Sequence, residues 1–283
     1  MIDYGLKDKV AIITGANNPW GIGATTALAL AREGAKVDLV DKKILREFDE
    51  SKTNQNGADR YFKANAGGSD DVENKLKAMG ADYLILESDI SCEGAVKEIY
   101  AKVLEKYKRV DILVNNAADG DMEGIDTIEQ VTQNVIDDTF AVNVRGSILM
   151  IREFINHRTD YGRIVNLSTD ASQVFAGQIT YGASKATLEA LTRSIALEVA
   201  KYGITTAPTL VVIKDGKVET YMMIKNNEPK FYLSKGGLIT QKVKANHEFY
   251  FEGIKIMPLK LAERLLTQPR WATVCVLQEI MLC

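Results

Sequence analysis

The feature that most constrains the fold is an alternation of short apolar segments with longer amphipathic segments across residues 9–205. The short segments are rich in Val and Ile and are bounded by Gly or Asp, as is typical of strands. Near-continuous apolar runs of this kind suit a parallel sheet that is covered on both faces. The expected strands span residues 9–14, 35–40, 82–88, 111–116 and 162–168.

Helices are expected between these strands, because small and apolar residues recur there at helical spacing. The expected helices span residues 22–33, 69–79, 92–107, 131–154 and 181–201. The second of them opens with Ser69 followed by two Asp residues, which is an N-cap signal followed by first-turn acids. Strand–helix alternation implies right-handed βαβ units, so the sequence predicts an α/β protein with a doubly wound, Rossmann-type parallel sheet.

Composition excludes several classes of protein. The net charge of -3 gives no reason to expect nucleic acid as a partner. The cysteines form no CxxC pair, and His157 and His247 are not spaced as metal ligands, so no metal site is expected. No run approaches the roughly 18 apolar residues that span a bilayer, and the first residues do not resemble a signal peptide. We therefore expect a cytoplasmic protein without membrane association.

A glycine-rich loop separates the first strand from the first helix. It contains Gly15, Gly21 and Gly23. Glycine is needed at such positions, because a Cβ would keep the backbone away from a pyrophosphate. The first-turn N–H groups and the helix dipole then favour an anion. Together with Ile22, these glycines are the expected cradle for a dinucleotide cofactor.

The end of the second strand carries Asp41, at the distance from the loop that the dinucleotide fingerprint expects. A carboxylate accepts hydrogen bonds from ribose hydroxyls and repels a 2′-phosphate, which favours NAD over NADP. Lys42 and Lys43 follow directly, and either can neutralise a 2′-phosphate, so NADP remains the alternative. The polar segment 46–68 is expected to be an extended surface loop, which either overhangs the adenosine end of the cofactor or is a tolerated insertion.

Two residues of the last expected helix suggest proton transfer. Tyr181 and Lys185 are four positions apart, so their side chains share a helix face. A free tyrosine has a pKa of about 10, and a nearby ammonium lowers it by stabilising the phenolate. Tyr181 can then act as general acid in carbonyl reduction and as general base in alcohol oxidation. Ser168, at the carboxyl end of a strand, can hold the substrate oxygen.

The order of these motifs resembles the short-chain dehydrogenase/reductase family over about residues 6–205, and in particular its bacterial 3-oxoacyl-acyl-carrier-protein reductase-type members. The matching motifs are TGANNPWGIG, NNAA at 115–118, Asn143 in AVNV, Ser168 in NLS, and YGASK at 181–185. The resemblance implies that Lys185 also holds the nicotinamide ribose and that Asn143 anchors a water in a proton relay. It further implies that Asn115 supports the sheet and the adenosine ribose.

The same resemblance implies that Asp89 contacts the adenine. It also implies a homodimer or homotetramer that pairs through the helices expected at 131–154 and 181–201. The substrate would be a small carbonyl compound or alcohol, either a 3-oxoacyl thioester or a small ketone. The alternative from another functional class is a catalytically inactive dinucleotide-binding module that acts as a sensor or an interaction protein.

Two departures from the family pattern stand out. More residues separate Gly15 from Gly21 than the usual pattern has, and no Pro-Gly follows the helix that ends near residue 201. Pro208 and the apolar residues after it can still supply a sixth strand, and residues 214–217 are a hairpin signal. We therefore expect a dinucleotide-binding and catalytic domain at 1–205 and a divergent segment at 206–283, with a helical stretch at 258–266. That segment is a substrate lobe, a foreign segment or the product of a shifted reading frame.

Overall fold

The computed structural model describes residues 5–55, 57–120, 126–172, 176–214, 217–225, 228–233, 237–239, 249–251 and 254–256, with side chains only up to residue 206 and without that of Asp170. The chain divides into two compact units, the first ending at Pro208 and the second beginning at Thr209. The helical stretch expected at 258–266 lies outside the described residues.

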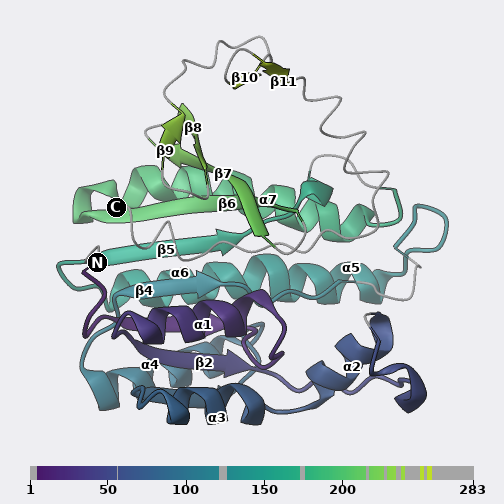
Figure 1. Cartoon of the computed structure of the whole chain (residues 1–283), viewed down its shortest axis with the longest axis horizontal. Helices are drawn as coiled ribbons and strands as arrows, with labels where there is room; N and C mark the ends of the chain where they lie inside the picture. The colour runs from purple at the N-terminus through teal and green to yellow at the C-terminus, as the bar shows by residue number, and fades with distance from the viewer. Residues whose placement is uncertain are drawn as a thin grey trace. The chain divides into compact units, whose positions relative to one another are not determined.

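A parallel sheet forms the first unit. Its strands are β1 (Val10–Thr14), β2 (Lys36–Asp41), β3 (Tyr83–Glu87), β4 (Ile112–Asn115), β5 (Gly162–Leu167) and the start of β6 (Ile204–Lys214). They lie in the order β3-β2-β1-β4-β5-β6, and the pairings among β1 to β5 are all parallel (Figure 1). This is the doubly wound Rossmann order, so the predicted fold class and the five predicted strands are confirmed.

Helices connect these strands. They are α1 (Ile22–Arg32), α2 (Ala58–Ala66), α3 (Asp70–Ala78), α4 (Glu93–Tyr107), α5 (Gln133–Phe140), α6 (Ser147–Asn156) and α7 (Ile179–Val199). Short 3-10 turns lie at Glu50–Lys52, Asp170–Ser172 and Ala200–Tyr202. In place of the single helix predicted at 131–154, the chain forms α5 and α6, joined by a π-helical segment at Ala141–Gly146 that periodicity alone does not reveal.

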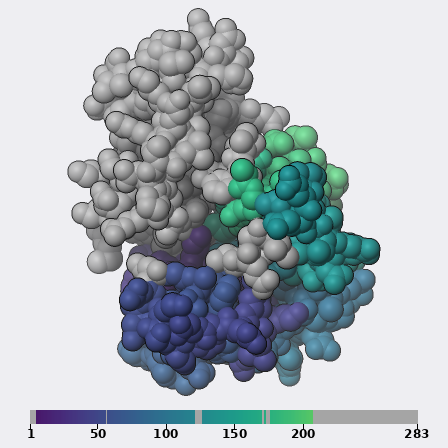
Figure 2. Space-filling model, turned by 90° about the vertical axis from the view of Figure 1, so that its right-hand side faces the viewer, coloured from purple at the N-terminus to yellow at the C-terminus, as the bar shows by residue number. Residues whose placement is uncertain are grey.

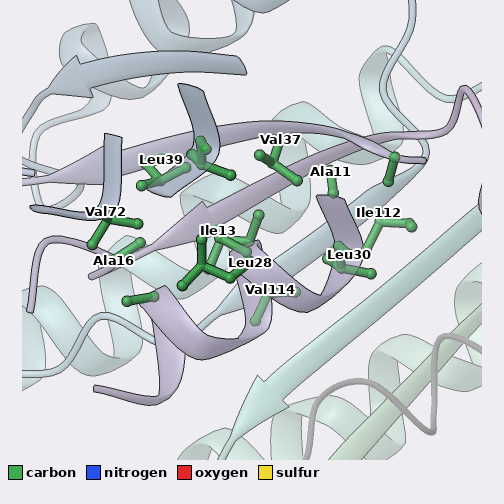
Figure 3. Packing of buried hydrophobic residues seen from close by; sticks show 14 of the residues in the cluster. Ala11, Ile13, Ala16, Leu28, Leu30, Val37, Leu39, Val72, Ile112 and Val114 are labelled. Atoms are coloured by element: carbon green, nitrogen blue, oxygen red, sulfur yellow. The ribbon is translucent and has the colours of Figure 1, made fainter. Parts of the chain in front are cut away.

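The core occupies both faces of the sheet, because successive strand residues point to opposite sides. On one face Ala11 and Ile13 of β1 pack with residues of α1 and α3 (Figure 3). On the other face Val10 and Ile12 pack with residues of α4 and α6. The strand β1 is therefore apolar on both sides, which explains why its residues form a continuous apolar run.

The segment predicted as an extended loop at 46–68 instead contains α2 and the 3-10 turn at Glu50–Lys52, so that prediction was wrong. None of the α2 residues is buried, and its apolar residues are too few to show a helical period. Aromatic contacts hold the segment instead: Arg60 lies 3.9 Å from the Trp20 ring centroid, and Arg46 lies 5.5 Å from that of Phe62. The segment is exposed at the side of the molecule that Figure 2 faces (dark blue).

The second unit contains antiparallel strands. The later part of β6 pairs with β7 (Lys217–Lys225), β7 with β8 (Glu228–Leu233), and β8 with β9 (Gly237–Ile239). Lys214 pairs with Lys217, so the predicted hairpin at that position is confirmed, as is the sixth strand that contains Pro208. A separate pair consists of β10 (Phe249–Phe251) and β11 (Ile254–Ile256).

None of the helices in the described part of the chain has the length and apolar character needed to cross a bilayer. The same residues contain no group of three or more His, Cys, Asp or Glu side chains that is suited to a metal ion.

Candidate active site

The glycine loop forms a tight passage between β1 and α1. Gly15 has a φ of +67°, and a Cβ there would lie 2.7 Å from the Cα of Ala117. A Cβ on Gly23 would lie 2.5 Å from the carbonyl oxygen of Gly15. Gly21 is the N-cap of α1, and Ile22 is its first residue, with no side-chain cap on the helix. The N–H groups of the first turn lack intrahelical partners, so the loop and helix start fit a pyrophosphate.

Asn116 ties this loop to β4. Its Nδ2 donates to the carbonyl oxygens of Thr14 at 2.9 Å and Gly15 at 2.8 Å. The backbone N–H groups of Asn116 and Ala117 both donate to Oγ1 of Thr14. Sequence reasoning selected the neighbouring Asn115 and missed Asn116, although both belong to the same NNAA motif.

Asp41 lies at the carboxyl end of β2 and is 4% exposed. Its Oδ1 accepts a hydrogen bond of 2.7 Å from the hydroxyl of Ser69. Burial raises the pKa of Asp41, and the bond from Ser69 works against that rise. Ser69 is the N-cap residue of α3, but its hydroxyl does not cap the helix, because it is turned toward Asp41.

The two lysines after Asp41 are both paired with carboxylates. Lys42 lies 2.6 Å from Asp89, and Lys43 lies 3.1 Å from Glu87. Burial alone would raise the pKa of Asp89, but the hydrogen bonds from Lys42 and Ser91 lower it overall. Asp89 is therefore held as an ion-paired carboxylate beside the end of β2.

Tyr181 and Lys185 lie on the first turns of α7. The Nζ of Lys185 lies 5.7 Å from the centroid of the Tyr181 ring and donates a 2.9 Å hydrogen bond to the carbonyl oxygen of Leu167. Lys185 is 2% exposed, and burial lowers its pKa to about 8. Gly120 lies against the Tyr181 ring, where a Cβ would come within 2.9 Å of Cδ2. The predicted pair therefore shares one face, beside the loop that follows β4.

The start of α7 is fixed by a residue that sequence reasoning missed. The buried carboxylate of Asp126 accepts hydrogen bonds from the backbone N–H of Thr180 at 2.9 Å and of Tyr181 at 3.0 Å. A carboxylate satisfies these N–H groups and complements the positive end of the helix. Asp126 lies 55 positions before Tyr181 in the chain, so no local sequence motif predicts the contact.

Ser168 directly follows β5 and is buried. Its hydroxyl donates to Oε1 of Glu189, which also accepts a hydrogen bond of 2.7 Å from Ser172. Glu189 is four positions after Lys185 on α7. Neither Glu189 nor Ser172 was selected from the sequence.

Asn143 lies in the π-helical segment and is fully buried. Its Nδ2 donates to the carbonyl oxygen of Asp119 at 2.8 Å and to the hydroxyl of Ser184 at 2.9 Å. Its Oδ1 accepts from the backbone N–H of Asp119 at 2.7 Å. The side chain therefore connects the loop after β4 to α7. π-Helical turns of this kind are frequent at functional sites.

Asn115 is buried at the end of β4 and links that strand to β5. Its Nδ2 donates to Oδ1 of Asn166 at 2.8 Å, and Asn166 donates in turn to Thr192 on α7. The Oδ1 of Asn115 has no hydrogen-bond partner among the described residues. The side chain of Asn115 therefore connects β4 to β5 inside the sheet.

The segment 46–68 contacts both the glycine loop and the loop that follows β4. The Nδ2 of Asn17 lies 3.4 Å from the carbonyl oxygens of Asn65 and Gly67. Arg46 lies 3.5 Å from the carboxylate of Asp119, in the loop that follows β4. A small cavity lies between the segment and this loop. Its lining residues are Ile44, Arg46, Tyr61, Phe62, Asn65, Ala118, Asp119 and Gly120.

Comparison with known proteins finds dehydrogenases and other oxidoreductases. The family profile described as short chain dehydrogenase matches residues 51–230, which begin after the glycine loop and β2. An uncharacterized oxidoreductase of Thermotoga maritima is 33% identical over 70% of this chain and 68% of its own length. A (2S)-[(R)-hydroxy(phenyl)methyl]succinyl-CoA dehydrogenase subunit of Thauera aromatica is 30% identical over 82% of each chain. The NAD-dependent glycerol dehydrogenase of Listeria innocua is 28% identical over 76% of this chain and 75% of its own length.

Solved structures agree with this result. The structure of NAD+-bound xylitol dehydrogenase is similar with a TM-score of 0.58 and 25% identity, over 72% of this chain and 69% of that chain. A short-chain dehydrogenase/reductase mutant from Serratia marcescens gives a TM-score of 0.59 and 26% identity over 72% and 73%. The chain therefore belongs to the short-chain dehydrogenase/reductase family and is an NAD(P)-dependent oxidoreductase that acts on CH–OH groups.

Proposed function

We propose that Tyr181 exchanges the proton in an NAD(H)-dependent interconversion of a carbonyl compound and a secondary alcohol. The observation that carries the proposal is the placement of Tyr181 against the buried Nζ of Lys185, beside the strand end that carries Ser168. When bound, the nicotinamide ring accepts or donates the hydride at its C4. The protein's own part is to position the substrate oxygen and to move its proton.

Lys185 is suited to assist Tyr181. Its pKa of about 8 leaves the ammonium mostly charged near neutrality. A buried positive charge near the phenol favours the phenolate, which makes Tyr181 a better base for the alcohol and a ready acid for the carbonyl. We further infer that Lys185 holds the nicotinamide ribose hydroxyls.

Ser168 and Asn143 complete the proposed catalytic set. Ser168 places a hydroxyl at the carboxyl end of β5, where it can hydrogen-bond to the substrate oxygen as negative charge develops. Three hydrogen bonds to Asp119 and Ser184 fix Asn143 between the loop after β4 and α7. Its proposed role is to anchor a water in a relay from Lys185 to solvent.

NAD is the proposed preference over NADP. Asp41 supports this, because its carboxylate at the end of β2 can accept from ribose hydroxyls and repels a 2′-phosphate. The pairing of Lys42 with Asp89 and of Lys43 with Glu87 adds support, since both ammonium groups already have counter-charges. In the same proposal the glycine loop residues Gly15, Gly21, Ile22 and Gly23 hold the pyrophosphate. Asp89 contacts the adenine and Asn115 supports the adenosine ribose.

The segment 46–68 is proposed to overhang the adenosine end of the cofactor. Its contacts with Asn17 on one side and Asp119 on the other span the cradle formed by the glycine loop and the loop after β4. A mere surface insertion needs neither contact.

A 3-oxoacyl thioester is the proposed substrate class, with small ketones as the alternative. The similarity to the Thauera aromatica protein, which is named for a CoA thioester, supports the first choice. The similarity to the glycerol dehydrogenase supports the second. The protein is proposed to be cytoplasmic.

A homodimer or homotetramer that pairs through α5, α6 and α7 is the proposed assembly. Exposed apolar side chains on these helices support it, namely Ile136, Ile148 and Leu197, with Leu197 70% exposed. Sedimentation of a monomer at micromolar concentration would refute this assembly.

The test of the function is the variant Tyr181→Phe, which keeps the ring and removes the exchangeable proton. NADH affinity should stay within about twofold, while turnover of a ketone and 3-oxoacyl thioester panel should fall at least ~100-fold. Unchanged turnover would sink the mechanism. Tight NADH binding by the unaltered protein, with no turnover of any carbonyl compound, would favour a dinucleotide-binding sensor instead.

A further inference from the structure

Glu189 lies in contact with the proposed substrate-binding hydroxyl. It follows Tyr181 and Lys185 on α7 at intervals of four positions, so the three side chains lie on successive turns. Its Oε1 accepts from Ser168 and, at 2.7 Å, from Ser172. Ser168 is 7% exposed, so this contact forms largely out of solvent.

A serine hydroxyl has a single proton to donate. In this structure the proton of Ser168 points to a carboxylate oxygen, which is a stronger acceptor than a neutral carbonyl oxygen. A ketone that enters the site must therefore compete with Glu189 for that proton. The competition changes during the reaction, because the substrate oxygen gains negative charge as the hydride is transferred.

We propose that Glu189 is a positioning residue that withholds the Ser168 proton from the ground-state carbonyl and thereby sets the affinity for substrate. Ser168 then turns to the substrate oxygen only as charge develops, so its hydrogen bond favours the transition state over the bound ketone. This inference rests on the proposed function. It assigns to Glu189 an effect on KM that acts through Ser168.

Ser172 makes the exchange feasible. The hydroxyl of Ser172 lies 2.7 Å from Oε1 of Glu189 and 2.7 Å from the carbonyl oxygen of Thr169, and its single proton goes to one of them at a time. When Ser168 turns away, Ser172 can give this proton to Glu189, so the carboxylate still has a donor within reach. The loss of one donor is therefore smaller than it would be for a carboxylate held by Ser168 alone.

The variant Glu189→Gln tests the proposal, because it keeps the size and an acceptor oxygen but removes the charge. We expect KM for the ketone to fall roughly threefold to tenfold, the range that separates a charged from a neutral acceptor, with kcat within about twofold. In the Ser168→Ala background the same change should leave KM unaltered. Glu198→Gln, an exposed change on the same helix, is the matched control and should alter neither constant.

An unchanged KM in Glu189→Gln would overturn the inference, and so would an equal fall in both backgrounds, since the effect would then not act through Ser168. The contact has a readout that does not need turnover. The shifts in Tm of Ser168→Ala and Glu189→Gln should be non-additive, and additive shifts would also overturn it. If the unaltered protein turns over no carbonyl compound, the proposed function fails and the inference falls with it. If the unaltered protein turns over a carbonyl compound but Glu189→Gln has the same KM, the proposed function stands and only this inference fails.

Discussion

The hydroxyl of Ser69 lies 2.7 Å from Oδ1 of Asp41 and donates a hydrogen bond to it. Asp41 ends β2, and Ser69 precedes α3, so the two elements meet where the cofactor ribose is proposed to bind. The bond holds the carboxylate in one orientation and opposes the rise in pKa that burial causes.

Removal of the carboxylate should therefore change the choice of cofactor. We expect Asp41→Ala to weaken NADH binding by about tenfold or more, the loss of hydrogen bonds to a charged acceptor, while NADPH binding weakens less or improves. Ser69→Ala should weaken NADH binding by a few-fold. Ser51→Ala removes a similar 2.6 Å bond to an exposed aspartate, Asp49, and is the control. Fluorescence titration with both nucleotides measures these changes, and an unaltered preference in Asp41→Ala would contradict the proposed role.

The ion pair between Arg46 and Asp119 should slow cofactor release if the segment 46–68 overhangs the dinucleotide. We expect Arg46→Ala to accelerate NADH dissociation several-fold, and Asp119→Ala to do the same. The double variant should be no faster than the single ones, because both remove the same contact. Lys52→Ala, which breaks an exposed ion pair with Asp49 inside the segment, is the control. Stopped-flow dissociation measures these rates. If all four variants release NADH at the rate of the unaltered protein, the segment is only a surface insertion.

The cap that Asp126 provides should matter for turnover more than for cofactor binding. Asp126→Ala leaves two N–H groups at the start of α7 without their acceptor, including that of Tyr181. We expect a loss of stability of about 1–3 kcal/mol and a fall in kcat, with NADH affinity nearly unchanged. Asp126→Asn keeps one acceptor oxygen and should recover part of both. Urea unfolding and steady-state kinetics test this, and a normal kcat in Asp126→Ala would show that the cap does not position Tyr181.

The fold could be read from the sequence because its signals are local. Apolar runs and glycines mark β1 and the loop after it, and the four-residue interval places Tyr181 beside Lys185. The contacts that position these groups are not local. Asp126 lies 55 positions from Tyr181, and Ser168 lies 21 positions from Glu189. A side chain's partner across such distances depends on the packing of the whole domain, which no single-sequence pattern records.

The helix α2 shows a second limit of sequence reasoning. Its residues are polar and none is buried, so neither periodicity nor hydrophobicity announces it. Contacts with residues outside the helix, such as that between Arg60 of α2 and the Trp20 ring, support it instead. The π-helical segment around Asn143 has the same character, because its irregular backbone leaves no trace in residue spacing.

A buried acid within β2 should make stability depend on pH. Asp38 is fully buried, and neither carboxylate oxygen has a hydrogen-bond partner among the described residues. Burial raises its pKa well above the ordinary value, and Lys106 opposes this only in part. Below the unfolded-state pKa of about 3.9 the acid is protonated in both states, so its titration does not change the free energy of unfolding there. As the pH rises above that value, the unfolded chain releases the proton and the folded chain keeps it.

The free energy of unfolding should therefore fall by up to about 1.4 kcal/mol per pH unit until the folded pKa of Asp38 is reached. Asp38→Asn removes the titration, so its stability relative to the unaltered protein should increase with pH across this range. Urea unfolding at a series of pH values measures the difference. Asp160→Asn is the control, because that side chain is 91% exposed and its change should give no such trend. If the difference between Asp38→Asn and the unaltered protein stays constant with pH, the carboxyl is not kept protonated in the folded state.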